Sequence, residues 1–131
     1  MKEPVLQVRN LSIGFNESGS SINAVKNVSF EVAGGEILAI VGESGSGKSV
    51  TALSLMQLLP MQAIVKGQLL FANKNIAATD LLKASSKEIN AIRGKDMAMI
   101  FQEPMTSLNP VLTCGYQVME AVILHQKVST K

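Results

Sequence analysis

The sequence of 131 residues predicts an α/β fold, with a small antiparallel β layer ahead of a core of parallel strands and helices. Three observations predict this fold. Apolar and polar residues alternate in two early segments, residues 5–13 and 28–32, as in strands buried on one face. Residues 37–41 (Ile-Leu-Ala-Ile-Val) form a continuous apolar run, which is typical of a parallel sheet buried on both faces. A glycine-rich loop then leads into an apolar segment of helical length, residues 50–59.

The first strand is expected at residues 5–13, with Leu6 and Val8 on one face. The polar composition of residues 16–23 predicts a loop after it. The second alternating segment follows, and a Gly-Gly pair at residues 34–35 predicts the turn that ends it. Two alternating strands joined in this way predict an antiparallel layer.

The helix predicted at residues 50–59 is apolar on nearly all sides, so we expect it to be buried and to end at Pro60. Residues 85–88 (Ser-Ser-Lys-Glu) fit a capping box, the serine–glutamate pair that satisfies backbone N–H groups at a helix start. The remaining elements are expected in chain order as a strand at 67–71, the capped helix at 87–93 followed by Gly94, an apolar strand at 97–101, a loop at 102–110 and a helix at 115–127.

The composition favours a folded domain and gives no case for nucleic-acid binding. Apolar residues make up 47% of the chain and charged residues 17%, which is enough for a core and unlike a disordered segment. The net charge is +2, and the basic residues form no cluster. Four Phe, one Tyr and no Trp leave few rings for stacking on bases.

The chain is expected to work in a reducing compartment, without inserting into a membrane. Its one cysteine, Cys114, excludes an internal disulfide framework. No apolar segment near the start has the form of a signal peptide, and no apolar run approaches the ~20 residues needed to span a bilayer. We therefore expect a cytosolic protein, or one held at a membrane by a partner.

The glycine-rich loop matches the phosphate-binding pattern Gly-x-x-x-x-Gly-Lys-Ser/Thr in full. Its glycines let successive backbone N–H groups turn inward and surround phosphate oxygens, at the positive end of the helix that follows. Lys48 is expected on the β- and γ-phosphates of ATP and Ser49 on Mg²⁺. The predicted nucleotide-contacting residues of this segment are Gly42, Glu43, Ser44, Gly45, Ser46, Gly47, Lys48, Ser49 and Val50.

Two other interpretations of the loop are weak. A flexible Gly/Ser turn would match this pattern by chance in roughly one per cent or less of chains this long. A dinucleotide-binding motif would need a glycine where this chain has Val50. The loop therefore predicts a P-loop NTPase, although by itself it fits kinases, GTPases, helicases and transporters alike.

Residues 41–49 (VGESGSGKS) and 97–110 (MAMIFQEPMTSLNP) narrow the choice, together with the strand pair ahead of the loop. At these residues the sequence resembles the ATP-binding cassette (ABC) subunits of bacterial importers, in the dipeptide, oligopeptide, nickel and glutathione branch. The resemblance covers nearly the whole chain, and these two segments are highly specific to that branch.

The resemblance implies roles for two residues outside the loop. Gln102 matches the glutamine of the family's Q-loop, which reaches Mg²⁺ and the attacking water. The predicted catalytic residues are therefore Lys48 and Gln102, and the predicted metal ligands are Ser49 and Gln102. Phe15, 27 positions before Gly42, lies about where the family keeps an aromatic ring that stacks on adenine. The family more often has tyrosine there, and a core phenylalanine is the alternative.

The resemblance also implies that residues 1–131 are the N-terminal part of one nucleotide-binding domain. The chain contains no LSGGQ-like signature, no apolar run ending in Asp-Glu and no switch histidine segment, so we expect truncation before the signature helix and the Walker B strand. The expected parts are an antiparallel layer at residues 1–35, the P-loop unit at 36–60, the core up to the Q-loop at 61–103 and the start of the helical subdomain at 104–131.

The implied function is that of an ATP-binding subunit which couples ATP binding and hydrolysis to uptake of a peptide or a related small solute. Implied partners are permease subunits, a second cassette and, indirectly, a solute-binding protein, at the cytoplasmic face of the inner membrane. The chain alone is expected to bind ATP without hydrolysing it. A non-catalytic nucleotide-binding fragment is the alternative, while a soluble kinase is disfavoured because Arg9 and Arg93 cannot supply an arginine-rich lid. Peptide, glutathione and nickel all remain open as substrates.

Overall fold

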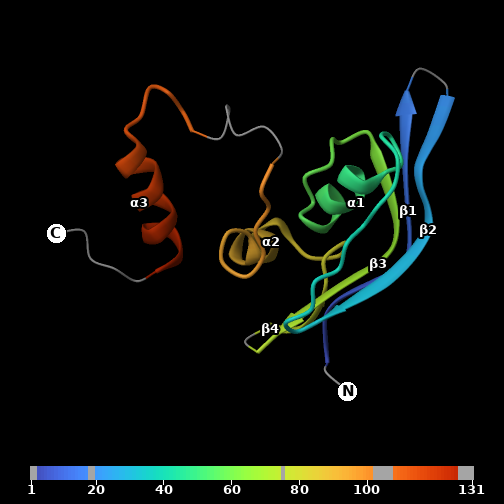
Figure 1. Ribbon diagram of the computed structural model, residues 1–131, viewed down its shortest axis with the longest axis horizontal. Helices are drawn as coiled ribbons and strands as arrows, with labels where there is room; N and C mark the ends of the chain where they lie inside the picture. Colours follow the sequence, from blue (N-terminus) through green and yellow to red (C-terminus); the bar gives the residue numbers. More distant parts are fainter. Residues whose placement is uncertain (1–2, 18–19, 75, 102–107, 127–131) are drawn as a thin grey trace. The chain divides into compact units, whose positions relative to one another are not determined.

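The structure is a computed structural model that describes residues 3–17, 20–74, 76–101 and 108–126 (Figure 1). It divides into two compact units, one ending at Ile89 and one beginning at Asn90. The elements are β1 (Pro4–Glu17), β2 (Ser20–Ala33), α1 (Lys48–Leu55), β3 (Ala63–Asn73), β4 (Ile76–Asp80), α2 (Ser86–Ile92) and α3 (Cys114–His125).

The predicted antiparallel layer is confirmed, and it is larger than expected. Four strands form one sheet in the order β2-β1-β3-β4, and all three neighbouring pairs are antiparallel (Figure 1). The strand predicted at 67–71 is the centre of the longer β3, and β4 was not predicted at all. Strand β3 pairs with the edge of β1 that a two-stranded ribbon would leave without hydrogen-bond partners.

A bulge in β1 decides which side chains of that strand are buried. Asn10 has a φ of 51°, and the pairing with β2 shifts between Val8 and Leu11. Val8, Leu11 and Ile13 are therefore all buried, although strict alternation would put Val8 on the opposite face from the other two. The Asn10 N–H donates to Ser29 Oγ at 2.8 Å, which ties the bulge to β2.

The loop predicted at residues 16–23 is wrong for the residues that the structure describes. Asn16 pairs with Ser21 and Glu17 with Ser20, so both strands continue to the end of the hairpin. The backbone ladder does not depend on apolar side chains, and the solvent-facing part of an antiparallel pair tolerates a polar composition. The predicted turn after β2 is confirmed: Gly35 has a φ of 77°, and the Glu36 N–H donates to the Ala33 carbonyl oxygen at 3.1 Å.

The parallel strand predicted at residues 37–41 and the apolar strand predicted at residues 97–101 are not formed. Ile37 is 96% exposed and Ile100 is 99% exposed, and in the described part of the chain the single parallel contact is an isolated bridge between Arg93 and Met97. A strand of a parallel sheet depends on hydrogen bonds from neighbouring strands, and none of the four described strands pairs with either segment. Most of their apolar side chains are consequently exposed, while Met97 and Met99 are half-buried.

Helix α1 begins two residues earlier and ends four residues earlier than predicted. It ends in a Schellman-type closure, since Gln57 has a φ of 50° and the Leu58 N–H donates to the Leu53 carbonyl oxygen at 2.9 Å. Pro60 therefore does not end the helix. The expected burial on all sides is also wrong, because the buried residues of α1 are the polar Thr51 and Ser54.

The capping box is confirmed at the start of α2. The Ser85 N–H and hydroxyl donate to Glu88 Oε2 at 2.8 and 2.6 Å, and the Glu88 N–H donates to Ser85 Oγ at 3.4 Å. Gly94 follows the helix with a φ of 76°, as expected for a glycine after a helix end. Sequence alone predicted this element well because all its determinants lie within ten residues of each other.

The stabilisation that the capping box gives to α2 depends on pH through the carboxylate of Glu88. Two hydrogen bonds lower the pKa of Glu88 from its ordinary value of 4.5. The larger effect comes from the Ser85 hydroxyl and the smaller from the Ser85 backbone N–H. Because the folded-state pKa is lowered, the stabilisation is present above the unfolded-state pKa and is lost as pH falls through the folded-state value. We expect an NMR titration to place the Glu88 midpoint below 4.5, and Ser85→Ala to raise it. A midpoint that responds equally to the control Ser86→Ala would contradict this.

The helix predicted at residues 115–127 is confirmed as α3. Thr113 caps it by accepting a hydrogen bond from the Tyr116 N–H at 3.3 Å. Residues 102–107 of the predicted loop lie outside the described residues, and residues 108–110 contain neither helix nor strand. Among the helices of the described ranges, none has the length and apolar character needed to cross a bilayer.

Candidate phosphate-binding site

The glycine-rich loop leads directly into the first turn of α1. Gly45 and Gly47 have φ values of 80° and 89°, which side-chain-bearing residues adopt only at a cost. The Ser46 N–H donates to the Glu43 carbonyl oxygen at 3.2 Å, so the loop closes through a turn of its own backbone. Helix α1 begins at Lys48, directly after the loop.

Gly47 lets the loop lie against strand β2. A Cβ on this residue would stand 2.6 Å from the carbonyl oxygen of Ala24 and 3.0 Å from Val25 Cγ2. Gly47 is buried, and its own carbonyl oxygen accepts hydrogen bonds from the Thr51 N–H at 2.8 Å and from Thr51 Oγ1 at 2.9 Å. The loop is thus held to the sheet on one side and to the helix on the other.

The Lys48 side chain curls back into the loop. Its Nζ donates to the carbonyl oxygens of Gly42 and Glu43 at 2.8 and 2.6 Å and to Ser46 Oγ at 3.3 Å. An ammonium group has three protons to donate, so these bonds use its whole capacity. A phosphate that approaches Lys48 would have to replace at least one of them.

The start of α1 is open to an anion. Gly47 occupies the N-cap position, gives no side-chain cap, and the first turn contains no acidic residue. The first backbone N–H groups of a helix have no partner inside it and carry the positive end of its dipole. Ser49, the predicted Mg²⁺ ligand, is exposed in this turn. The residues present therefore fit a phosphate group with its metal ion.

Phe15 lies on β1, in the pairing with β2 that continues to the part of β2 in contact with Gly47. It pairs with Ile22 on β2 and with Ala63 on β3, and it is half-buried. Ile22 is two residues, or about 7 Å of strand, from Ala24, which contacts the loop at Gly47. Gln102 lies outside the described residues, so the structure does not place it.

A hollow of about 300 Å³ borders the loop. Its walls are β2, the segment that precedes the loop, and the loop itself with Lys48 and Thr51. Sequence reasoning did not single out the β2 residues of this wall, Lys26 among them. They lie 12 to 18 residues before the motif, and only the pairing of β2 and its contact with Gly47 bring them to the loop.

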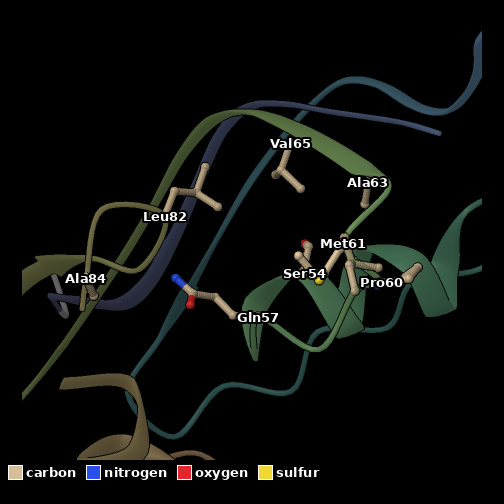
Figure 2. Close-up of a pocket in the computed structure, with 9 residues that line it drawn as sticks. Ser54, Gln57, Pro60, Met61, Ala63, Val65, Leu82 and Ala84 are labelled. Atoms are coloured by element: carbon tan, nitrogen blue, oxygen red, sulfur yellow. The ribbon is translucent and has the colours of Figure 1, made fainter. Parts of the chain in front are cut away.

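A larger cavity lies elsewhere, beyond the end of α1. It measures about 360 Å³, and Figure 2 shows Ser54 and Gln57 on one side with Val65 of β3 and Leu82 on the other. The Gln57 side-chain amide donates to the Leu81 carbonyl oxygen, which links the helix end to the segment after β4. None of the lining residues belongs to the glycine-rich loop.

A glycine-rich loop that wraps its own lysine at an uncapped helix start is the arrangement of P-loop nucleotide-binding proteins. The sequence matches the ABC transporter family over residues 25–129, and the chain belongs to that family. The resemblance noted in the sequence is therefore confirmed.

Three similar proteins are named as ATP-binding proteins of dipeptide transport or glutathione import. The chain is 50% identical over 131 residues to the dipeptide transport ATP-binding protein DppD of Bacillus subtilis, covering 98% of this chain and 38% of the relative. It is 50% identical over 127 residues to the glutathione import ATP-binding protein GsiA of Salmonella choleraesuis, covering 95% and 20%. The GsiA protein of Pectobacterium atrosepticum is 49% identical over 129 residues, covering 97% and 21%. The chain thus spans well under half of each relative.

Proposed function

We propose that residues 1–131 supply the phosphate-binding part of an ABC importer's ATP-binding subunit, which couples ATP binding and hydrolysis to uptake of a peptide or a related small solute. The observation that carries the proposal is the loop around Lys48 at the open start of α1. The names of the relatives, dipeptide and glutathione import proteins, support the solute class.

In this proposal ATP and Mg²⁺ bind at the loop. Backbone N–H groups of residues 42–50 and the Lys48 ammonium hold the phosphates, and Ser49 Oγ is a ligand of Mg²⁺. Gln102 is a second metal and water contact, and Phe15 stacks on the adenine. The position of Phe15, on the ladder that meets Gly47, supports that role.

The partners follow from the same proposal. Permease subunits would cross the membrane, and this chain's protein would bind them at the cytoplasmic face of the inner membrane. A second cassette would complete the ATP sites, and a solute-binding protein would act indirectly. The division of the chain at residues 35, 60 and 103 stays a prediction.

We propose binding without turnover for residues 1–131 on their own. The sequence contains no LSGGQ segment and no Asp-Glu pair, so the family's signature contact and general base are not supplied by these residues. Phosphate release from Mg·ATP is expected to stay at the background rate. Release that exceeds background and disappears in Lys48→Ala would contradict this part of the proposal.

Calorimetric titration of Mg·ATP into residues 1–131 tests the proposal. We expect binding in the wild-type chain and a dissociation constant about 10- to 150-fold higher in Lys48→Ala, the loss of a hydrogen-bonded ionic contact. The control is Lys66→Ala, which removes an exposed lysine of β3 that does not line the hollow beside the loop, and it is expected to bind as the wild type does. No binding by the wild type at millimolar ATP, or equal dissociation constants in the two variants, would overturn the proposal.

A further inference from the structure

A second lysine lines the hollow beside the phosphate-binding loop. Lys26 on β2 and Lys48 border the same space of about 300 Å³, together with Ser46 and Gly47. No aspartate or glutamate is among the residues that line it. In the described ranges, no carboxylate forms an ion pair with either lysine. Two positive charges at one hollow without a counter-charge favour an anion there.

The backbone around Lys26 is fixed with respect to the loop. Ala24, two residues earlier on β2, is the residue whose carbonyl oxygen Gly47 approaches. Asn27, the next residue, has a φ of 50°, and its N–H donates to Ser12 Oγ of β1 at 2.9 Å. A bulge of this kind redirects the neighbouring side chains of a strand. Val25 is 5% exposed and Lys26 is exposed, so the two point to different environments.

The two lysines differ in what their ammonium groups already bind. Lys48 gives its three protons to the loop itself. Lys26 is exposed and has no such bonds to described residues. Lys26 is therefore the lysine of this hollow with protons to give to a ligand.

We propose that Lys26 contacts the phosphate chain of the bound nucleotide as a second cation, and that it makes the site prefer nucleoside triphosphates over monophosphates. This inference rests on the proposed function, because it places Lys26 at the same nucleotide. The preference follows from charge: the attraction between Lys26 and the ligand grows with the negative charge of the phosphate chain.

The test compares Lys26→Gln, Lys26→Arg and the control Lys66→Gln in residues 1–131, with ATP, ADP and AMP as probes at low and high salt. Lys26→Gln is expected to raise the dissociation constant for ATP about three- to tenfold, that for ADP less, and that for AMP not measurably. Its ATP binding should depend less on salt than that of the wild type. Lys66→Gln should bind as the wild type does, and Lys26→Arg, which keeps the charge, should retain more of the ATP affinity and salt dependence than Lys26→Gln.

The outcomes distinguish a failure of the role of Lys26 from a failure of the proposed function. If the wild type does not bind ATP, the proposed function fails and this inference fails with it. If the wild type binds and Lys48→Ala does not, but Lys26→Gln matches Lys66→Gln in affinity and salt dependence, only the role of Lys26 is overturned. A loss for Lys26→Gln that is equal for ATP and AMP would also overturn it, because the contact would then not be with the outer phosphates.

Discussion

Gly47→Ala is expected to lower the free energy of unfolding by about 2–4 kcal/mol. Two costs add at this position. A φ of 89° strains any residue with a Cβ, and the new Cβ would stand 2.6 Å from the carbonyl oxygen of Ala24. That oxygen belongs to the backbone of β2, which the ladder with β1 holds in place, so the neighbour cannot yield as a flexible side chain would. ATP binding should be lost together with stability, since the start of α1 would move.

Gly45→Ala is the matched control in the same loop. Gly45 has a φ of 80°, but a Cβ there would meet nothing within 4 Å. Only the backbone strain remains, and we expect a cost of about 1–2 kcal/mol. Urea unfolding followed by circular dichroism measures both variants. Equal destabilisation by the two substitutions would show that the contact between Gly47 and β2 does not limit what position 47 accepts.

Leu69→Ala is expected to cost about 3–5 kcal/mol, because it opens a cavity in the middle of the sheet. Leu69 is 0% exposed and pairs with Val8 across the two central strands. Its carbonyl oxygen accepts the Leu81 N–H at 2.7 Å, so few neighbours can move to fill the space. The free energy of unfolding of a domain is only about 5–15 kcal/mol, so this substitution would remove much of it.

Leu58→Ala provides the same chemical change at an exposed site. Leu58 is 41% exposed in the turn after α1, so its truncation should cost about 1 kcal/mol or less. The midpoint of thermal or urea unfolding measures the difference. A cost at Leu69 no larger than that at Leu58 would contradict the assignment of β3 to the centre of the core.

Features that depend on neighbouring residues were predicted well. The capping box at Ser85 and Glu88 and the turn at Gly35 follow from local hydrogen bonds and local backbone angles. Features that depend on distant partners were not. Strand β4 has a weak pattern of its own and is formed by pairing with β3, while residues 37–41 have a strong strand pattern but no described partner strand. The pattern of apolar and polar residues indicates whether a segment can form a strand. Pairing with a neighbouring strand decides whether the strand forms.

The same division holds for the candidate site. Residues 42–49 by themselves predicted a phosphate-binding loop with its lysine, because glycine backbone freedom, an ammonium group and a helix start are all properties of one short segment. Only the tertiary structure decided that Gly47 lies against Ala24 and that Lys26 borders the loop's hollow. These two contacts join residues some twenty positions apart. They exist because the register of the β1–β2 hairpin and its bulges brings that part of β2 to the start of α1, and register depends on the whole sheet.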